Sequence, residues 1–134
     1  HCSLQAAEEL QPRLVKQRAM IEALRKYGFY TMEDFFTMKR EAEGYVSWGY
    51  KTGDGWLIGA EITGHILHEC PKVLAVQPFG CMPNHTCGRG LYPSLQKKLP
   101  QGMIVSCDVD SSGSKLNVYN RVRMLVDMPL KMGK

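Results

Sequence analysis

The chain has 134 residues, enough for one domain of ordinary size, and 44% of them are hydrophobic, which argues against disorder. Its 17 basic and 13 acidic residues give a net charge of +4, without a dense basic patch, so nucleic-acid binding is not expected. No apolar run approaches the roughly 20 residues that span a bilayer, so no membrane partner is expected. The start at His1 is compatible with a fragment of a longer protein or with a tag remnant.

The cysteines indicate a reducing compartment. There are five, Cys2, Cys70, Cys81, Cys87 and Cys107, and no two have the C-x-x-C spacing of a zinc ribbon or a thioredoxin site. A domain with this apolar fraction does not need disulfides. We therefore expect reduced thiols and a cytoplasmic location.

Two helices are predicted in an N-terminal helical segment, residues 1–52. The first, residues 4–27, either has Pro12 in its first turn or begins at that residue. The second, residues 32–46, has Thr31 as its predicted N-cap. The apolar face of the first helix consists of Leu10, Leu14, Ile21 and Leu24.

A third helix is predicted at residues 56–69, where an isoleucine recurs at every fourth position. Gly59 and Gly64 each cost about 1 kcal/mol relative to alanine in a helix interior. Their presence indicates close packing against a neighbouring element. The face expected to be buried consists of Ile58, Ile62 and Ile66.

An α/β fold is predicted for the remainder, residues 53–134. Apolar runs at residues 73–76 and 103–108 are typical of buried strands, and a short helix is predicted between them at residues 91–99. This order indicates a right-handed crossover and a small, Rossmann-like parallel βαβ unit. A last helix, residues 116–126, is expected to direct four side chains inward: Val118, Val122, Leu125 and Val126.

Two strands make a very small sheet. Either further strands lie near residues 45–48, or the chain is one edge of a larger domain. The sequence alone leaves both readings open.

The loop at residues 77–90 follows the first predicted strand, where ligands bind in open α/β sheets. Gly80 and two prolines restrict its backbone around Cys81. A thiolate there is a soft ligand for iron or a nucleophile, and His85 could be a ligand or a proton donor. The alternative is that Cys81 packs as a small hydrophobic residue while His85 caps the next helix.

A second loop, residues 108–114, follows the second predicted strand. Asp108 and Asp110 could hold a cation. The alternative is that Ser112 or Ser114 caps the last helix, whose N-terminus could also receive an anion such as a CoA phosphate.

A family resemblance rests on an ordered string of matches over residues 53–125. GWLI at residues 55–58, the pair Ala60-Glu61 and VQPFGCMPNH at residues 76–85 resemble the C-terminal region of acyl-CoA dehydratase activase-related proteins. These belong to the 2-hydroxyacyl-CoA dehydratase and CoA-substrate-specific enzyme activase family. The later matches are Gly88-Arg89-Gly90, Asp108-Val109-Asp110, Ser114, Asn117 and Asn120-Arg121.

The resemblance implies that Cys81 is one thiolate ligand of a 4Fe–4S cluster, in a cofactor-binding loop that includes Pro83, Asn84 and His85. Such clusters serve ATP-driven, low-potential electron transfer in anaerobes. A cluster needs about four protein ligands, and only Cys81 is carried over. The others are expected from an upstream part of the parent protein or from a dehydratase subunit.

No phosphate-binding glycine loop is found, so the chain alone is not expected to be catalytic. A homo-oligomer remains open. Two other hypotheses also remain: a metal-free interaction or scaffold domain that retains the fold, and a thiol enzyme that uses Cys81 with His85.

Overall fold

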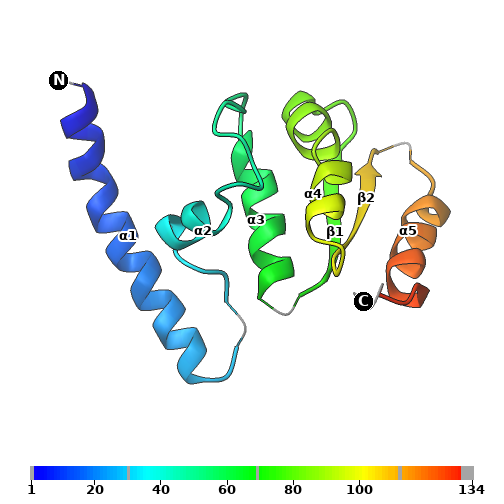
Figure 1. Cartoon of the computed structure of the whole chain (residues 1–134), viewed down its shortest axis with the longest axis horizontal. Coiled ribbons are helices and arrows are strands. Elements are labelled where there is room, and N and C mark those ends of the chain that lie inside the picture. The colour runs from blue at the N-terminus through cyan, green and yellow to red at the C-terminus, as the bar shows by residue number, and fades with distance from the viewer. Residues whose placement is uncertain (1, 30, 69, 112, 131–134) are drawn as a thin grey trace. The chain divides into compact units, whose positions relative to one another are not determined.

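The computed structural model describes residues 2–29, 31–68, 70–111 and 113–130, with side chains from residue 11 onward. The chain forms two compact units, His1–Arg40 and Glu41–Lys134, which we treat separately. Figure 1 follows the elements in chain order from α1 to α5.

The first unit contains the long helix α1 (Cys2–Lys26). Pro12 lies inside this helix, so both predictions for it, in the first turn or at the true start, are wrong. The predicted apolar face is only partly covered: Leu14 and Ile21 are half-buried, whereas Leu24 stays 44% exposed. The Leu10 side chain lies outside the described residues.

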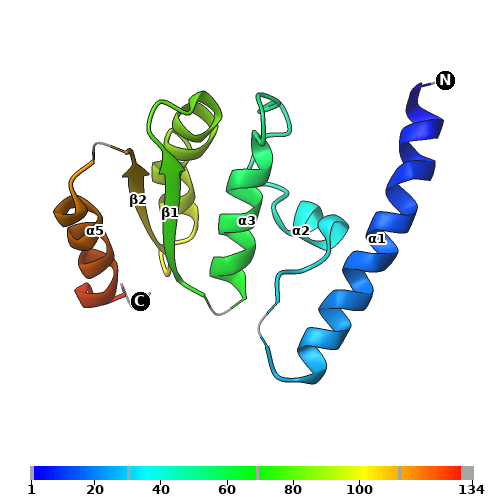
Figure 2. The same ribbon diagram turned by 180° about the vertical axis from the view of Figure 1, so that it is seen from behind.

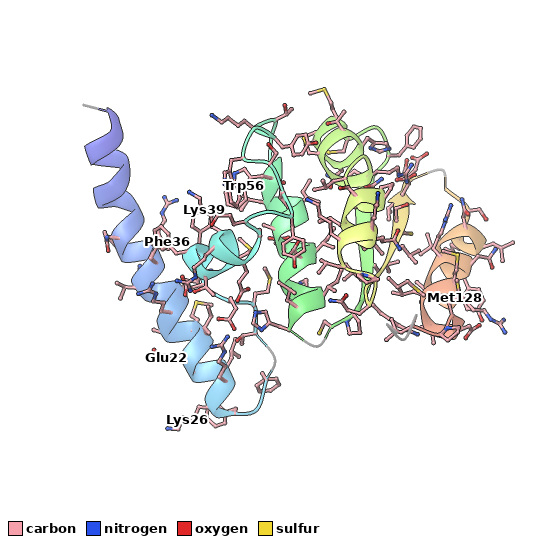
Figure 3. The ribbon with its side chains drawn as sticks, in the orientation of Figure 1. Glu22, Lys26, Phe36, Lys39, Trp56 and Met128 are labelled. Atoms are coloured by element: carbon pink, nitrogen blue, oxygen red, sulfur yellow. The ribbon has the colours of Figure 1, made fainter. Side chains whose placement is uncertain are left out.

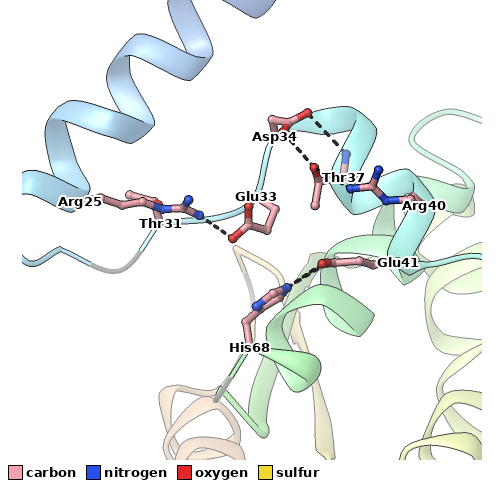
Figure 4. A network of polar contacts seen from close by, with 8 residues as sticks. All are labelled: Arg25, Thr31, Glu33, Asp34, Thr37, Arg40, Glu41 and His68. Carbon is pink, nitrogen blue, oxygen red and sulfur yellow. Dashed lines mark hydrogen bonds and ion pairs between the residues drawn. The ribbon is translucent and has the colours of Figure 1, made fainter.

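The helix α2 (Phe35–Glu41) is shorter than predicted, because its cap lies later in the chain. Asp34, rather than Thr31, accepts from the backbone N–H of Phe36 at 3.1 Å. Figure 4 shows the side chains around this cap. Thr31 instead accepts a hydrogen bond from Arg25 Nε at 2.9 Å. A short polar side chain just before the first turn satisfies otherwise unpaired N–H groups, and here Asp34 meets that need.

The second unit begins with turns. Residues 42–46 form turns and a bend, so the alternative of a hidden strand at residues 45–48 is wrong. Trp48 and Trp56 then meet edge to face, with ring centroids 4.9 Å apart. Trp56, labelled in Figure 3, opens the next helix. Gly55 precedes it with φ +42°, and a Cβ there would overlap the carbonyl oxygen of Tyr50, so the turn requires glycine.

The α/β arrangement predicted for this unit is confirmed. Its strands pair in parallel, with Lys72 opposite Met103 and Pro78 opposite Val109. Figure 2 shows the first strand between the second strand and α3. The elements are α3 (Trp56–Leu67), β1 (Lys72–Pro78), η1 (Asn84–Arg89), α4 (Tyr92–Lys98), β2 (Met103–Val109) and α5 (Lys115–Asp127).

The helix α3 supplies much of the core. Ile62 and Ile66 are buried as predicted, while Ile58 is half-buried. A Cβ on Gly59 would overlap Leu91 Cδ2, so the close packing expected there is confirmed. The same expectation is wrong for Gly64, because a Cβ at that position would meet nothing within 4 Å.

The last helix is the clearest departure from prediction. Ser114 caps it, accepting from the backbone N–H of Leu116 at 3.3 Å, as one alternative expected. No residue of α5 is buried, however, so the predicted inward face is wrong. Leu125 is half-buried, and the other three predicted inward residues are exposed: Val118, Val122 and Val126.

Candidate functional site

The Cys81 loop leaves the carboxyl end of β1 through a tight turn. Gly80 has φ +75°, in the region that favours glycine, and Cys81 N donates to Pro78 O at 3.2 Å. The chain then winds at once into the π-helix η1, so the prediction of an irregular loop through residue 90 is wrong. π-Helical turns are rare and frequently lie at functional sites.

Cys81 stands at the N-terminal end of this helical segment. Its Sγ accepts a hydrogen bond from Asn84 Nδ2 at 3.0 Å. That side chain, and next the backbone N–H of Asn84, lower the pKa of the Cys81 thiol against the opposing effects of desolvation and Asp54. The sulfur is partly exposed. A thiol held by donors at a helix N-terminus favours its thiolate form, which is the nucleophile and metal ligand.

His85 lies one turn further on, but it contacts the backbone of Cys81 and not its sulfur. His85 Nδ1 is 2.9 Å from Cys81 O, and since a carbonyl oxygen only accepts, Nδ1 carries the proton. His85 Nε2 lies 3.9 Å from Asp108 Oδ1, beyond hydrogen-bond distance. The ring therefore fixes the Cys81 backbone rather than serving as a base for its thiol.

Asp108, at the end of β2, ties both strand ends to η1. Its Oδ1 accepts from Gln77 Nε2 at 2.6 Å and its Oδ2 from Arg89 Nη2 at 2.6 Å. These two hydrogen bonds, that of Gln77 first, lower the pKa of Asp108. Gln77 is only 1% exposed, and its Oε1 has no hydrogen-bond partner. The carboxylate thus holds the loop in place. Because both of its oxygens already accept hydrogen bonds, it has fewer lone pairs left to bind a cation.

The residues singled out from the sequence are therefore contiguous in one turn. Asn84 binds the Cys81 sulfur, His85 binds its carbonyl group, and Pro83 packs so close to Gly53 that a Cβ there would lie 2.6 Å from Pro83 Cγ. Gln77 and Arg89 had not been assigned a role. The sequence feature that could have identified Gln77 is its position as a polar residue directly after the apolar run at residues 73–76.

The remaining cysteines do not join Cys81. Of those whose side chains the structure describes, Cys87 and Cys107 are buried, Cys70 is half-buried, and all three are free thiols; the Cys2 side chain lies outside the described residues. Among the residues that the structure describes, no three His, Cys, Asp or Glu side chains come together to hold a metal ion.

A search for membrane-spanning helices and the comparisons with known proteins both give negative results. Over the described ranges, no helix has the length and apolar character needed to cross a membrane. Comparison with protein-family models, curated proteins and solved structures finds no match to this chain.

Proposed function

We propose that this chain is part of an iron–sulfur redox protein of the 2-hydroxyacyl-CoA dehydratase and activase system, and that Cys81 supplies one ligand of its cluster. The observation that carries the proposal is the Cys81 sulfur, partly exposed and held by Asn84 at the N-terminus of a helical turn. The resemblance of the surrounding motif supplies the identity of the bound group.

The residues fit such a cluster as one part of a shared site. Iron–sulfur clusters are held by about four thiolates, and hydrogen bonds to sulfur tune their reduction potential. Cys81 would bind iron, and Asn84 would keep its hydrogen bond to the sulfur. His85 and Asp108 would hold the loop in place. When bound, the cluster supplies one-electron transfer; the other ligands would come from an upstream part of the parent protein or from a dehydratase subunit.

The lowered pKa of Cys81 gives the first test. Replacing Asn84 by Ala removes the main donor to the sulfur, so we expect the Cys81 pKa to rise and its alkylation by iodoacetamide at neutral pH to slow. The measurement is the alkylation rate against pH, with the site identified by mass spectrometry. Asn117→Ala, in α5, is the matched control. An unchanged profile in Asn84→Ala would remove the geometric support for an activated thiolate.

The second test is direct. The intact chain is incubated anaerobically with ferrous iron, sulfide and a small thiol that can complete the ligand set. We expect visible thiolate-to-iron absorption that Cys81→Ser abolishes and Cys70→Ser keeps. Equal iron uptake by the Cys81→Ser protein would contradict the assignment.

A metal-free interaction domain is the second candidate. One observation favours it: among the residues that the structure describes, no further strand pairs with the outer edge of β1. On this reading the chain folds equally well with a chelator present, and Cys81→Ala changes no binding property. A thiol enzyme that pairs Cys81 with His85 receives no such support, because the ring is bound to the Cys81 carbonyl group.

A further inference from the structure

The open edge of β1 has a definite hydrogen-bonding register. Met103 N donates to Pro71 O at 2.7 Å, and Phe79 N donates to Val109 O at 3.0 Å. Bonding residues alternate along a parallel strand, so odd-numbered residues from 71 to 79 face β2. The backbone groups of Leu74 and Val76 therefore point to the opposite edge. Within the described part of the chain, the sheet has only the strands β1 and β2.

A cavity of about 420 Å³ runs beside this edge. Its floor is the middle of β1, residues 73–76, and its wall is one side of α3. Figure 2 shows α3 on the side of β1 away from β2. α3 contacts η1, α4 and β1. In α/β proteins, helices cover the faces of the sheet. Because α3 lies on the side of β1 away from β2, it borders the position that a further strand beside β1 would occupy. Its cavity-lining apolar residues are Leu57, Ile58 and Ile62.

The carboxylates that line the cavity favour an occupant with a basic side chain. Asp54 and Glu61 line it together with His65, and no lysine or arginine is among its lining residues. Desolvation of the Glu61 carboxyl group by the surrounding protein raises its pKa. The nearby His65 lowers this pKa, and the like charge of Asp54 raises it further. A basic side chain on the occupant would compensate these two carboxylates.

We propose that the edge of β1 takes up an extended segment of another polypeptide by strand addition, and that this segment carries a lysine or arginine opposite Glu61. Its backbone pairs with Leu74 and Val76. Every second side chain of the segment faces α3. Two of these are apolar and contact Leu57 and Ile62, and the basic one lies between them on the same face, where it reaches the two carboxylates. Main-chain pairing provides affinity in such complexes, and the side-chain positions provide specificity.

A second copy of this chain fits the cavity less well. The β1 strand of a second copy has one basic residue, Lys72, and its Nζ already donates to Val126 O at 2.8 Å. It would bring no free cation to Asp54 and Glu61. The inference does not use the chemistry of Cys81, although the two places adjoin: Asn84 lines the cavity, and Asp54 acts on the Cys81 thiol.

The test uses the intact chain and a labelled synthetic peptide of about eight residues, with valine, lysine and valine at three successive alternate positions, so that all three side chains share the face toward α3. We expect binding by fluorescence anisotropy, and about tenfold weaker binding of the same peptide with glutamate in place of lysine. Glu61→Lys should reverse this preference. The peptide N-methylated on the valine or lysine positions that face β1 should not bind, because it cannot complete the backbone ladder.

Three outcomes would overturn the proposal: equal binding of the lysine and glutamate peptides, undiminished binding of the N-methylated peptides, or failure of the lysine peptide to bind. Leu74→Pro removes an N–H from the open edge without removing one that faces β2, so it should weaken binding while circular dichroism stays unchanged. If that variant unfolds, Glu61→Lys and the N-methylated peptides still decide. Self-association through β1 would overturn the choice of partner.

The two proposals can fail separately. Cys81→Ser should bind the lysine peptide as the parent chain does, and Glu61→Lys should take up iron as the parent does. Loss of peptide binding in Cys81→Ser would contradict the independence of the strand-addition site.

Discussion

The helices α3 and α5 have similar lengths, and each belongs to the α/β unit, but they are buried to very different extents. In α3, Ala60 and Thr63 are 0% exposed, and Ile66 is 4% exposed. In α5 no residue is buried, and Val126 is 65% exposed. The comparison teaches that an apolar stripe predicts a helix face but does not guarantee a surface to cover it.

The surfaces that the two helices meet explain the difference. α3 contacts three elements, β1, η1 and α4, and Gly59 brings its backbone against Leu91. Among the described elements, α5 makes extensive contacts only with the two strands β1 and β2. Adjacent strands lie about 4.8 Å apart, and a helix with its side chains is about 10 Å wide, so two strands provide no more than about one helix width. The outer residues of α5 extend beyond that surface.

The largest expected effect compares a buried and an exposed side chain. Ile66→Ala should lower the free energy of unfolding by about 2–5 kcal/mol, since it leaves a cavity beside Gly102, where a Cβ would lie 2.6 Å from Ile66 Cδ1. Val126→Ala should change it by less than about 0.5 kcal/mol. Urea unfolding followed by circular dichroism measures both. A similar loss in the two variants would show that α5 is packed as tightly as α3.

An intermediate effect compares the two glycines inside α3. Gly59→Ala forces a methyl group against Leu91 and Val46, so it should destabilise the unit by about 1–3 kcal/mol. Gly64→Ala meets open space, and should stabilise it by about 0.5–1 kcal/mol through better helix propensity. Thermal unfolding of the two variants gives the signs. Equal signs would mean that α3 is not held at the distance described.

The third and smallest expected destabilisation by a test variant concerns the start of α5, with Val126→Ala and Gly64→Ala serving only as comparisons above. Ser114→Ala removes the cap on the backbone N–H of Leu116, and should cost about 1 kcal/mol. Ser114→Asp keeps an acceptor at the same position and serves as the control. The readout is the midpoint of urea unfolding. No change in the alanine variant would indicate that α5 contributes little to the cooperative unit.

The candidate site could be anticipated only as a set of neighbours in sequence. Its position after β1, the glycine turn and the polar side chains around Cys81 all lie within residues 77–85, so local sequence was enough to select them. The sequence could not indicate that Asn84, rather than His85, binds the sulfur. That choice depends on the π-helical winding of the turn.

The partners of Asp108 show the same limit over a longer distance. Gln77, Arg89 and Asp108 come from β1, η1 and β2, and only the parallel register places their side chains within hydrogen-bond distance. Residue types alone suggested a cation ligand at Asp108. Its role as an anchor required the pairing of the two strands.

The sequence by itself determined the βαβ order, the parallel pairing and the position of Cys81 after the first strand. These follow from local periodicity, turn residues and the handedness of the crossover. Tertiary structure decided which apolar faces are covered, which side chain binds the Cys81 sulfur, and that no described strand pairs with the outer edge of β1, beside the cavity lined by Asp54 and Glu61. Burial and long-range hydrogen bonds depend on residues distant in the chain, so no local pattern can specify them.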